Sequence, residues 1–394
     1  MGLLFLGYMM WIEWQKDYGP VPVPPAETST SAEVVPDVPD FNQETADSTV
    51  DLPSAPQDAT GPVAGTTAQD ADPARNLVTV TTDVLEIKID PVGGTIASAV
   101  LLDYPVDHDT PDVKVDLLRG GGNRLFIAQS GLLSRQQAPN HTSEYRAEAR
   151  EYALSQGDQA LSVPLHWTSD DGVKVTKTFT FQPGSYQVGV EHSVENGGRT
   201  AWSGSRYEQL QKSVPGDEDS GGFTNPGSYS FVGIGFYNPE DKFEKIDFDD
   251  VADDPYKKTS RNGWLAMIQH YFFSAWIPGA EDEVTYSTQA IEGNGWPRYI
   301  ARGVSAAKTV QPGEQAAFTS TLYAGPKLQD DLPEIADGLE YVVNYGIFTV
   351  FSKPLYWLLA KIHSVVGNWG WAIVILTILI KLAFFKLTEA QYRS

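Results

Sequence analysis

The sequence predicts a membrane protein with a large all-β sandwich between two apolar helical segments. Three observations predict this fold class. Period-two alternation of apolar and polar residues, broken by Gly, Pro and Asn clusters, recurs from Asn76 to Tyr323 and is typical of antiparallel sheets. Apolar runs at 2–12 and 369–385 stand near the two ends. Aromatic residues make up 11% of the chain, which favours strands and interfaces.

The first apolar run predicts an N-terminal transmembrane signal anchor over residues 1–18. A cleaved signal peptide is the alternative, but no basic residue precedes the run and no small-x-small site follows it. Trp11 and Trp14 are predicted to be membrane-interface aromatics, because Trp is enriched at headgroup level. The anchor is therefore preferred.

Residues 19–75 are predicted to be a disordered tether rich in proline and acidic residues. Arg75 is the only basic residue in this segment and Phe41 the only aromatic one. Such a composition cannot bury enough apolar surface to offset the entropy lost on ordering. A specific acidic binding motif is the alternative interpretation.

The sandwich domain is predicted over residues 76–335. Val78 and Val80 begin the alternation, and 91–94 (Pro-Val-Gly-Gly) supply a turn. The aromatic-rich stretch 264–278 is interpreted as a buried strand pair, not as a stack for a ligand.

After Pro326 the apolar period becomes helical. A short helix is expected over 328–339, followed by an interfacial amphipathic helix region over 336–367, with Pro354 in a first helical turn. Its apolar face is formed by Leu355, Leu358, Leu359 and Ile362. Because this stripe directly precedes an apolar run, we expect it to lie among lipid headgroups instead of in a protein core.

A second transmembrane helix is predicted over 368–387, with Trp369 and Trp371 as membrane-interface aromatics. Lys381, Lys386 and Arg393 stand towards its far end, which the positive-inside rule assigns to the cytoplasm. Residues 388–394 then begin a cytoplasmic region. The sandwich is expected on the periplasmic side of a bacterial inner membrane that the chain crosses more than once.

Lys381 lies twelve residues beyond Trp369, about 18 Å along a helix. Its long side chain could reach the nearby cytoplasmic interface. Alternatively it could face a polar cavity between helices, since charge inside a bilayer is costly and is often kept for function. The residues alone support both interpretations equally.

Composition excludes several other functions. A formal net charge of −23 argues against nucleic acid as a partner, and the absence of cysteine excludes disulfides and thiolate sites. The six histidines are scattered, and the acidic run at 247–254 lacks the glycine and final glutamate of a calcium loop. We therefore expect no metal, no cofactor and no catalytic residue, and hence no enzyme.

Several stretches resemble the YidC insertase family of Gram-negative bacteria. One is 262–278, from Asn-Gly-Trp-Leu-Ala-Met-Ile-Gln-His-Tyr-Phe to Ala-Trp-Ile-Pro, and another is 82–85 with 93–94. The most specific is 363–392, which contains His-Ser at 363–364 and Val-Gly-Asn-Trp-Gly at 366–370. The resemblance covers nearly all of the chain outside the tether.

The resemblance implies a periplasmic β-supersandwich similar to sugar mutarotases. It also implies a function as an insertase and chaperone for nascent integral membrane proteins, acting in the lipid bilayer alone or with the Sec translocon and its accessory subunits. A basic residue in the family's second span faces a hydrophilic groove that attracts polar parts of a client. Lys381 stands at that position, where family members usually carry arginine; lysine keeps the charge and loses the rigid donor fork.

The family continues beyond this point with further spans, so the resemblance implies that the groove needs residues beyond Ser394. Two other functions remain open. The chain could be a membrane-tethered periplasmic docking scaffold for translocon subunits, or a carbohydrate-binding mutarotase-like module. A fold alone does not confer its chemistry.

Overall fold

The computed structural model describes residues 76–215, 231–279, 281–291, 295–343 and 349–393, without the side chains of 349–351, 353 and 386–393. Trp11, Trp14, the predicted anchor 1–18 and the whole tether 19–75 lie outside the described residues. The chain divides into two compact units, one of residues 36–343 and one that contains 344–394. Each unit is described by itself.

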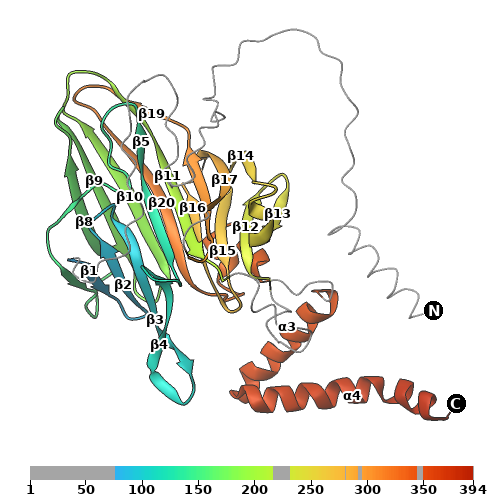
Figure 1. Cartoon of the computed structure of the whole chain (residues 1–394). Coiled ribbons are helices and arrows are strands. Elements are labelled where there is room, and N and C mark those ends of the chain that lie inside the picture. Colours follow the sequence, from blue (N-terminus) through green and yellow to red (C-terminus); the bar gives the residue numbers. More distant parts are fainter. Residues whose placement is uncertain (1–75, 216–230, 280, 292–294, 344–348, 394) are drawn as a thin grey trace, which may run out of the picture. The chain divides into compact units, whose positions relative to one another are not determined.

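Two large sheets form the first unit (Figure 1). The eleven-stranded sheet consists, in spatial order, of β14 (Lys257–Arg261), β17 (Glu283–Ile291), β18 (Arg298–Ser305), β11 (Trp202–Ser213), β5 (Phe126–Ser134), β4 (Thr110–Arg119), β3 (Thr95–Asp107), β2 (Leu85–Asp90), β1 (Val78–Thr81) and β7 (Glu151–Ala153), with β19 (Lys308–Val310) paired to β11. The nine-stranded sheet consists of β13 (Lys242–Ile246), β12 (Gly233–Asn238), β15 (Trp264–Ile268), β16 (Phe272–Pro278), β20 (Gln315–Pro326), β10 (Gln187–Asn196), β9 (Val173–Phe181), β8 (Leu161–Thr168) and β6 (Arg146–Ala147).

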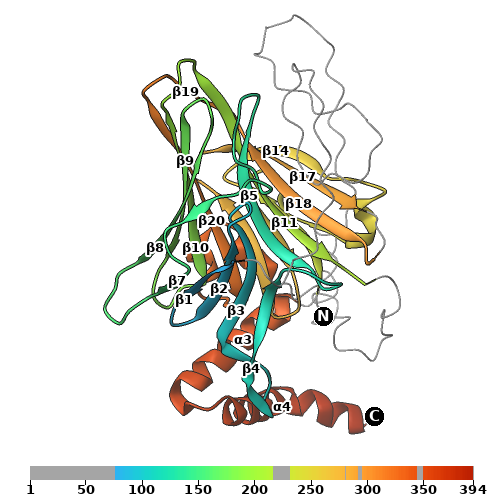
Figure 2. The same ribbon diagram turned by 60° about the vertical axis from the view of Figure 1, so that its left-hand side comes forward.

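The two sheets pack face to face, as the turned view in Figure 2 shows. Alternate residues point inward because successive side chains of a strand face opposite sides. In β9 this places Val175, Phe179 and Phe181 in the buried core together with Lys177, while Thr176, Thr178 and Thr180 between them are half-buried. The main core joins apolar side chains from both sheets, and a smaller cluster surrounds Trp202 and Phe318. The predicted all-β sandwich is confirmed.

The predicted turn at 91–94 connects β2 to β3. Gly93 and Gly94 have φ values of 77° and 55°, which residues with a Cβ rarely adopt. A Cβ on Gly93 would also collide with the backbone carbonyl of His141. The predicted buried strand pair in 264–278 is also confirmed, because β15 and β16 pair antiparallel and all five residues of β15 are buried.

The segment after β20 differs from the expected helix over 328–339. It forms only a four-residue helix, α2 (Leu332–Ile335), and a 3₁₀ turn, η3 (Leu339–Val342). Gly338 separates them with a φ of 74°, a left-handed conformation that interrupts a helix. Leu332, Leu339 and Val342 are buried in the main core, so this segment packs on the sandwich.

The second unit contains α3 (Thr349–Val366) and α4 (Trp369–Arg393). The prediction for Pro354 was wrong, because α3 begins five residues earlier and encloses this proline. A proline inside a helix removes one backbone N–H···O bond, a cost that the rest of the helix must offset. Among the described residues, no helix combines the length and apolar character needed to cross a membrane. The side chains at 386 and 387, which end the predicted second span, lie outside the described part.

Candidate functional site

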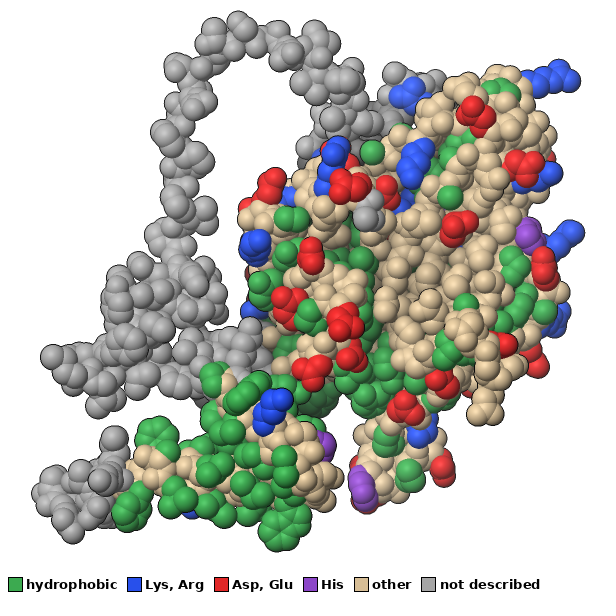
Figure 3. Space-filling view, turned by 180° about the vertical axis from the view of Figure 1, so that it is seen from behind, with side chains coloured by type: hydrophobic (Ala, Val, Ile, Leu, Met, Phe, Trp, Pro, Cys, Tyr) green, Lys and Arg blue, Asp and Glu red, His purple; other side chains and the backbone are tan. Residues whose placement is uncertain are grey.

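The predicted membrane-contacting residues lie on α3 and α4. Leu355 is exposed, whereas Leu358, Leu359 and Ile362 are half-buried. Trp369 and Trp371, at the start of α4, have exposed fractions of 48% and 64%. Figure 3 shows apolar side chains gathered over these helices, in contrast to the mixed surface of the sandwich. The described side chains of α3 and α4 therefore present an apolar surface to their surroundings.

Lys381 is exposed on α4, between the exposed apolar residues Leu379 and Leu382. None of the ion pairs found among the described residues includes it. The structure thus gives Lys381 apolar neighbours along its helix. Its predicted place in a groove, and the interfacial position of the α3 stripe, stay predictions.

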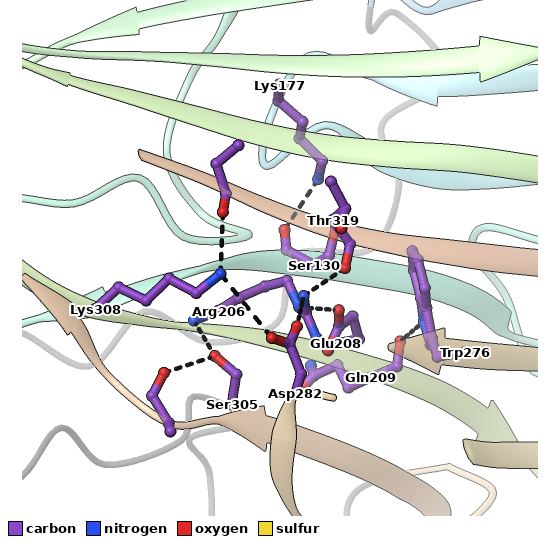
Figure 4. Close-up of polar contacts among 12 residues, drawn as sticks. Ser130, Lys177, Arg206, Glu208, Gln209, Trp276, Asp282, Ser305, Lys308 and Thr319 are labelled. Carbon is purple, nitrogen blue, oxygen red and sulfur yellow. Dashed lines mark hydrogen bonds and ion pairs between the residues drawn. The ribbon is translucent and has the colours of Figure 1, made fainter. Parts of the chain in front are cut away.

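A second concentration of polar groups lies inside the sandwich, where the sequence predicted only a core (Figure 4). Arg206 and Glu208 stand two residues apart on β11, share one face of the strand and form an ion pair. Both side chains are almost completely buried, with exposed fractions of 0% and 2%. Arg206 Nη1 also donates to Asp282 Oδ2 over 2.9 Å and to the carbonyl of Thr319 on β20.

Lys177 on β9 is the second buried cation. Its Nζ donates to the carbonyls of Gly93, Gly94 and Ser130, each over 2.9 Å. Burial lowers the pKa of Lys177 to about 7, and the negative charge of Glu208 acts in the opposite direction. Three acceptors match the three donors of an ammonium group, so this lysine ties β9 to the Gly-Gly turn and to β5.

His192 on β10 is fully buried near this cluster. Burial lowers its pKa well below the usual range, and the positive charges of Lys177 and Arg206 add to the effect, so the ring is neutral. Neither ring nitrogen has a hydrogen-bond partner within the described chain. Burial likewise raises the pKa of Glu208, an effect that Arg206 opposes.

Lys308 Nζ lies 3.9 Å from Asp282 Oδ1 at the edge of the cluster. The side chains of Asp282 and Lys308 have exposed fractions of 21% and 42%, so this edge reaches solvent. A catalytic group must reach its substrate, whereas Arg206, Glu208 and Lys177 are enclosed. The cluster therefore acts as a polar tie between the two sheets, in which Lys177 links β9 to β5 and Arg206 links β11 to β20. Among the described residues, no three His, Asp or Glu side chains converge on a position that could hold a metal.

Sequence reasoning missed this cluster. The available signal was the pair Arg206 and Glu208 at a spacing of two on a strand face that also carries Trp202 and Leu210. Asp282 and Lys177 could not be added from spacing, because they lie far away along the chain and meet β11 only through tertiary contacts.

The sequence model of the YidC periplasmic domain family matches residues 77–358. The membrane protein insertase YidC of Thioalkalivibrio sulfidiphilus is 39% identical over 405 residues, which cover 100% of this chain and 69% of that protein. The protein of the same name from Methylococcus capsulatus is 41% identical, covering 98% of this chain and 67% of its own length.

Solved structures show a weaker likeness. A galactose mutarotase related enzyme from Lactobacillus acidophilus is 8% identical and covers 63% of this chain and 97% of its own, with a TM-score of 0.41. At that score the likeness carries no argument about this chain.

Proposed function

The chain belongs to the YidC family of membrane protein insertases, which are not enzymes, and from this premise we propose that it supplies the outer domain and the client-contacting second span of an insertase. The sandwich stands in the periplasm, and residues 1–18 and 368–387 cross the inner membrane. Nascent integral membrane proteins are the clients, inserted alone or beside the Sec translocon.

One observation carries the proposal: a lysine, Lys381, is exposed on a helix whose neighbouring side chains are apolar. A cation within a bilayer is costly unless water or a counter-charge accompanies it. In a hydrophilic groove closed by further spans, Lys381 attracts the acidic or polar segment of a client and lowers the cost of moving that segment across. The interfacial stripe of α3 holds the outer end of the groove at the headgroups.

The test is made in a protein that continues this chain with the C-terminal part of the Methylococcus capsulatus relative. Liposomes containing this chimera are supplied with a small client that has an acidic periplasmic segment. We expect Lys381→Gln to reduce insertion at least tenfold and Lys381→Arg to preserve it, because charge attraction needs no specific donor geometry. Equal insertion by the parent and Lys381→Gln would exclude the groove function of this lysine.

The docking-scaffold alternative is favoured by a separate observation. Val106 and Val113 on the β3–β4 hairpin and Tyr271 after β15 have exposed fractions of 64%, 55% and 72%. Contiguous exposed apolar side chains are typical of contact sites, and Val106 and Val113 are exposed on the two strands of one hairpin. Removal of the hairpin with unchanged co-purification of translocon subunits would count against this function, which can coexist with insertion.

The carbohydrate-module alternative has weaker support. A hollow in the described surface of the sandwich has a volume of about 440 Å³ and is lined by polar groups that include Gln137, Asp170 and Arg199. Ligand sites are usually lined mainly by apolar and aromatic groups. The one aromatic residue in this lining, Trp202, is fully buried and offers no ring face.

A further inference from the structure

We propose that His363 and Trp369 form a ring clamp that fixes the angle between α3 and α4, so that both are positioning residues for Lys381. The ring stack is argued from the geometry of the helix junction alone. The positioning of Lys381 by this stack rests on the proposed function. The term ring clamp denotes these two side chains.

The junction between the helices is short and both helix ends are capped. Gly367 ends α3 with a φ of 69°, and its N–H donates to the carbonyl of His363 over 2.7 Å. This is the left-handed glycine cap that commonly ends helices. Asn368 begins α4, since its Oδ1 accepts from the N–H of Trp371 over 3.2 Å. Only two residues separate the helices, which meet at a corner in Figure 1.

The rings of the clamp come from opposite sides of this corner. His363 lies in the last turn of α3, and Trp369 is the first residue of α4. Their centroids are 3.8 Å apart and their planes differ by 9°, so the rings stack in parallel. Such a contact requires one particular orientation of the two helices, whereas each cap forms within or beside its own helix.

Close approach at the corner supports the same conclusion. Ala372, in the first turn of α4, is fully buried, whereas most of the described side chains around it on this helix are exposed. Gly367 has no atom within 4 Å of the position that a Cβ would occupy, so sterics at the glycine do not restrict the corner. The orientation is therefore left to contacts between the two helices, of which the ring stack is one.

The angle has a consequence for insertion. If α3 lies in the headgroups, a fixed corner holds Trp369 at the outer interface. Lys381 is then held about 18 Å further along α4, in the inner half of the bilayer. Loss of the clamp would let α4 tilt and would spread Lys381 over a range of depths.

The absence of cysteine from the chain allows a clean measurement. Leu355→Cys and Leu382→Cys place spin labels on exposed positions of α3 and α4, each roughly 20 Å from the corner. Pulsed electron spin resonance of the full chain in nanodiscs then reports the distance distribution between the labels. Relaxation by oxygen and by a water-soluble nickel chelate reports the depth of the label at position 382.

We expect a single narrow distance distribution for the parent chain and at least a twofold broader one for His363→Ala. His363→Phe should keep the narrow distribution, because phenylalanine retains a ring that can stack on Trp369. Comparison of this variant with His363→Ala distinguishes loss of the ring from a change in helix propensity. Ser364→Ala is the matched control, since the Ser364 hydroxyl bonds only the Lys361 carbonyl of its own helix. An unchanged distribution in His363→Ala, or no restoration by His363→Phe, would overturn the clamp.

The outcome is separable from that of the proposed function. The distance measurement involves no client, so loss of the clamp on His363→Ala is observed whether or not Lys381 acts in insertion. Conversely, insertion that is insensitive to Lys381→Gln removes the groove function and leaves the distance distributions unchanged. A broadened distribution with an unchanged depth of the label at 382 would overturn the positioning of Lys381.

Discussion

At the scale of single residues, the most consequential feature is the charge enclosed between the sheets. Arg206 meets two carboxylates, and Lys177 meets three backbone carbonyls. A buried ion pair rarely adds much net stability, but removal of one partner leaves the other charge without compensation. These residues are therefore sensitive positions even though they lie far from Lys381 in the sequence.

Replacement of Arg206 by leucine should lower the free energy of unfolding by about 3–5 kcal/mol, because Glu208 and Asp282 lose their buried counter-charge. Arg119→Ala is the matched control, since Arg119 pairs with Asp116 at the surface and such pairs contribute under about 1 kcal/mol. Urea unfolding of the full chain measures both. The double variant Arg206→Leu with Glu208→Leu should recover part of the loss; equal small effects of Arg206 and Arg119 would contradict the prediction.

Lys177 predicts a dependence of stability on pH. Its pKa is about 7 in the fold against 10.5 for an ordinary lysine, so between these values the unfolded chain binds more protons. The free energy of unfolding must then rise with pH in this window. The destabilisation caused by the buried ammonium group is fully present below pH 7. We expect a rise of about 2 kcal/mol between pH 7 and pH 9 that Lys177→Met lacks. The same pH response in both proteins would exclude this assignment.

At the scale of elements, strands could be predicted from the sequence more fully than helices. The alternation in β9 and β10 and the glycine turn at 91–94 are local signals, and the structure confirms them. Helix limits depended on tertiary packing, which drew Leu332 and Leu339 into the core and divided the expected helix over 328–339. The clamp at the α3–α4 corner was also not foreseen, because spacing does not reveal the orientation of two rings.

The tip of the β3–β4 hairpin, residues 105–113, is exposed and adds no side chain to the core. It projects from the sandwich in Figures 1 and 2, and Val106 and Val113 are more than half exposed. Replacement of 105–112 by an Asn-Gly turn should therefore change the free energy of unfolding by under about 1 kcal/mol. Gly93→Ala, in the turn against His141, is the contrasting variant and should cost about 1–3 kcal/mol. Thermal unfolding distinguishes them, and a large loss for the hairpin variant would show a hidden packing contribution.

At the scale of the whole molecule, the dominant property is negative charge. The net charge of −23 and the isoelectric point of about 4.5 keep copies of the chain apart at neutral pH by mutual repulsion. We expect a solubility minimum near pH 4.5 in detergent solution, measured by light scattering, and a return to clear solution above pH 6. Scattering that is independent of pH over this range would contradict the prediction.

The family and the sandwich could be predicted from sequence because their signals are repeated along the chain: alternation in many strands, and motifs in several separate segments. The interior cluster could not, since Arg206, Asp282 and Lys177 come from three strand regions that only the folded sheets bring together. Positions such as Lys381 were identified from chemistry, and their surroundings depend on contacts that a linear pattern does not contain.

The place of β20 in the nine-stranded sheet has a consequence for the order of events during export. This strand, Gln315–Pro326, lies between β16 and β10, yet it is the last of the described strands along the chain. Without β20, this sheet consists of two separate groups of strands. One group is β13, β12, β15 and β16, and the other is β10, β9, β8 and β6. Such long-range pairing is slow, because its loop-closure entropy precedes any gain from contacts. A chain that emerges N-terminus first therefore completes this sheet only after residues 315–326 have emerged.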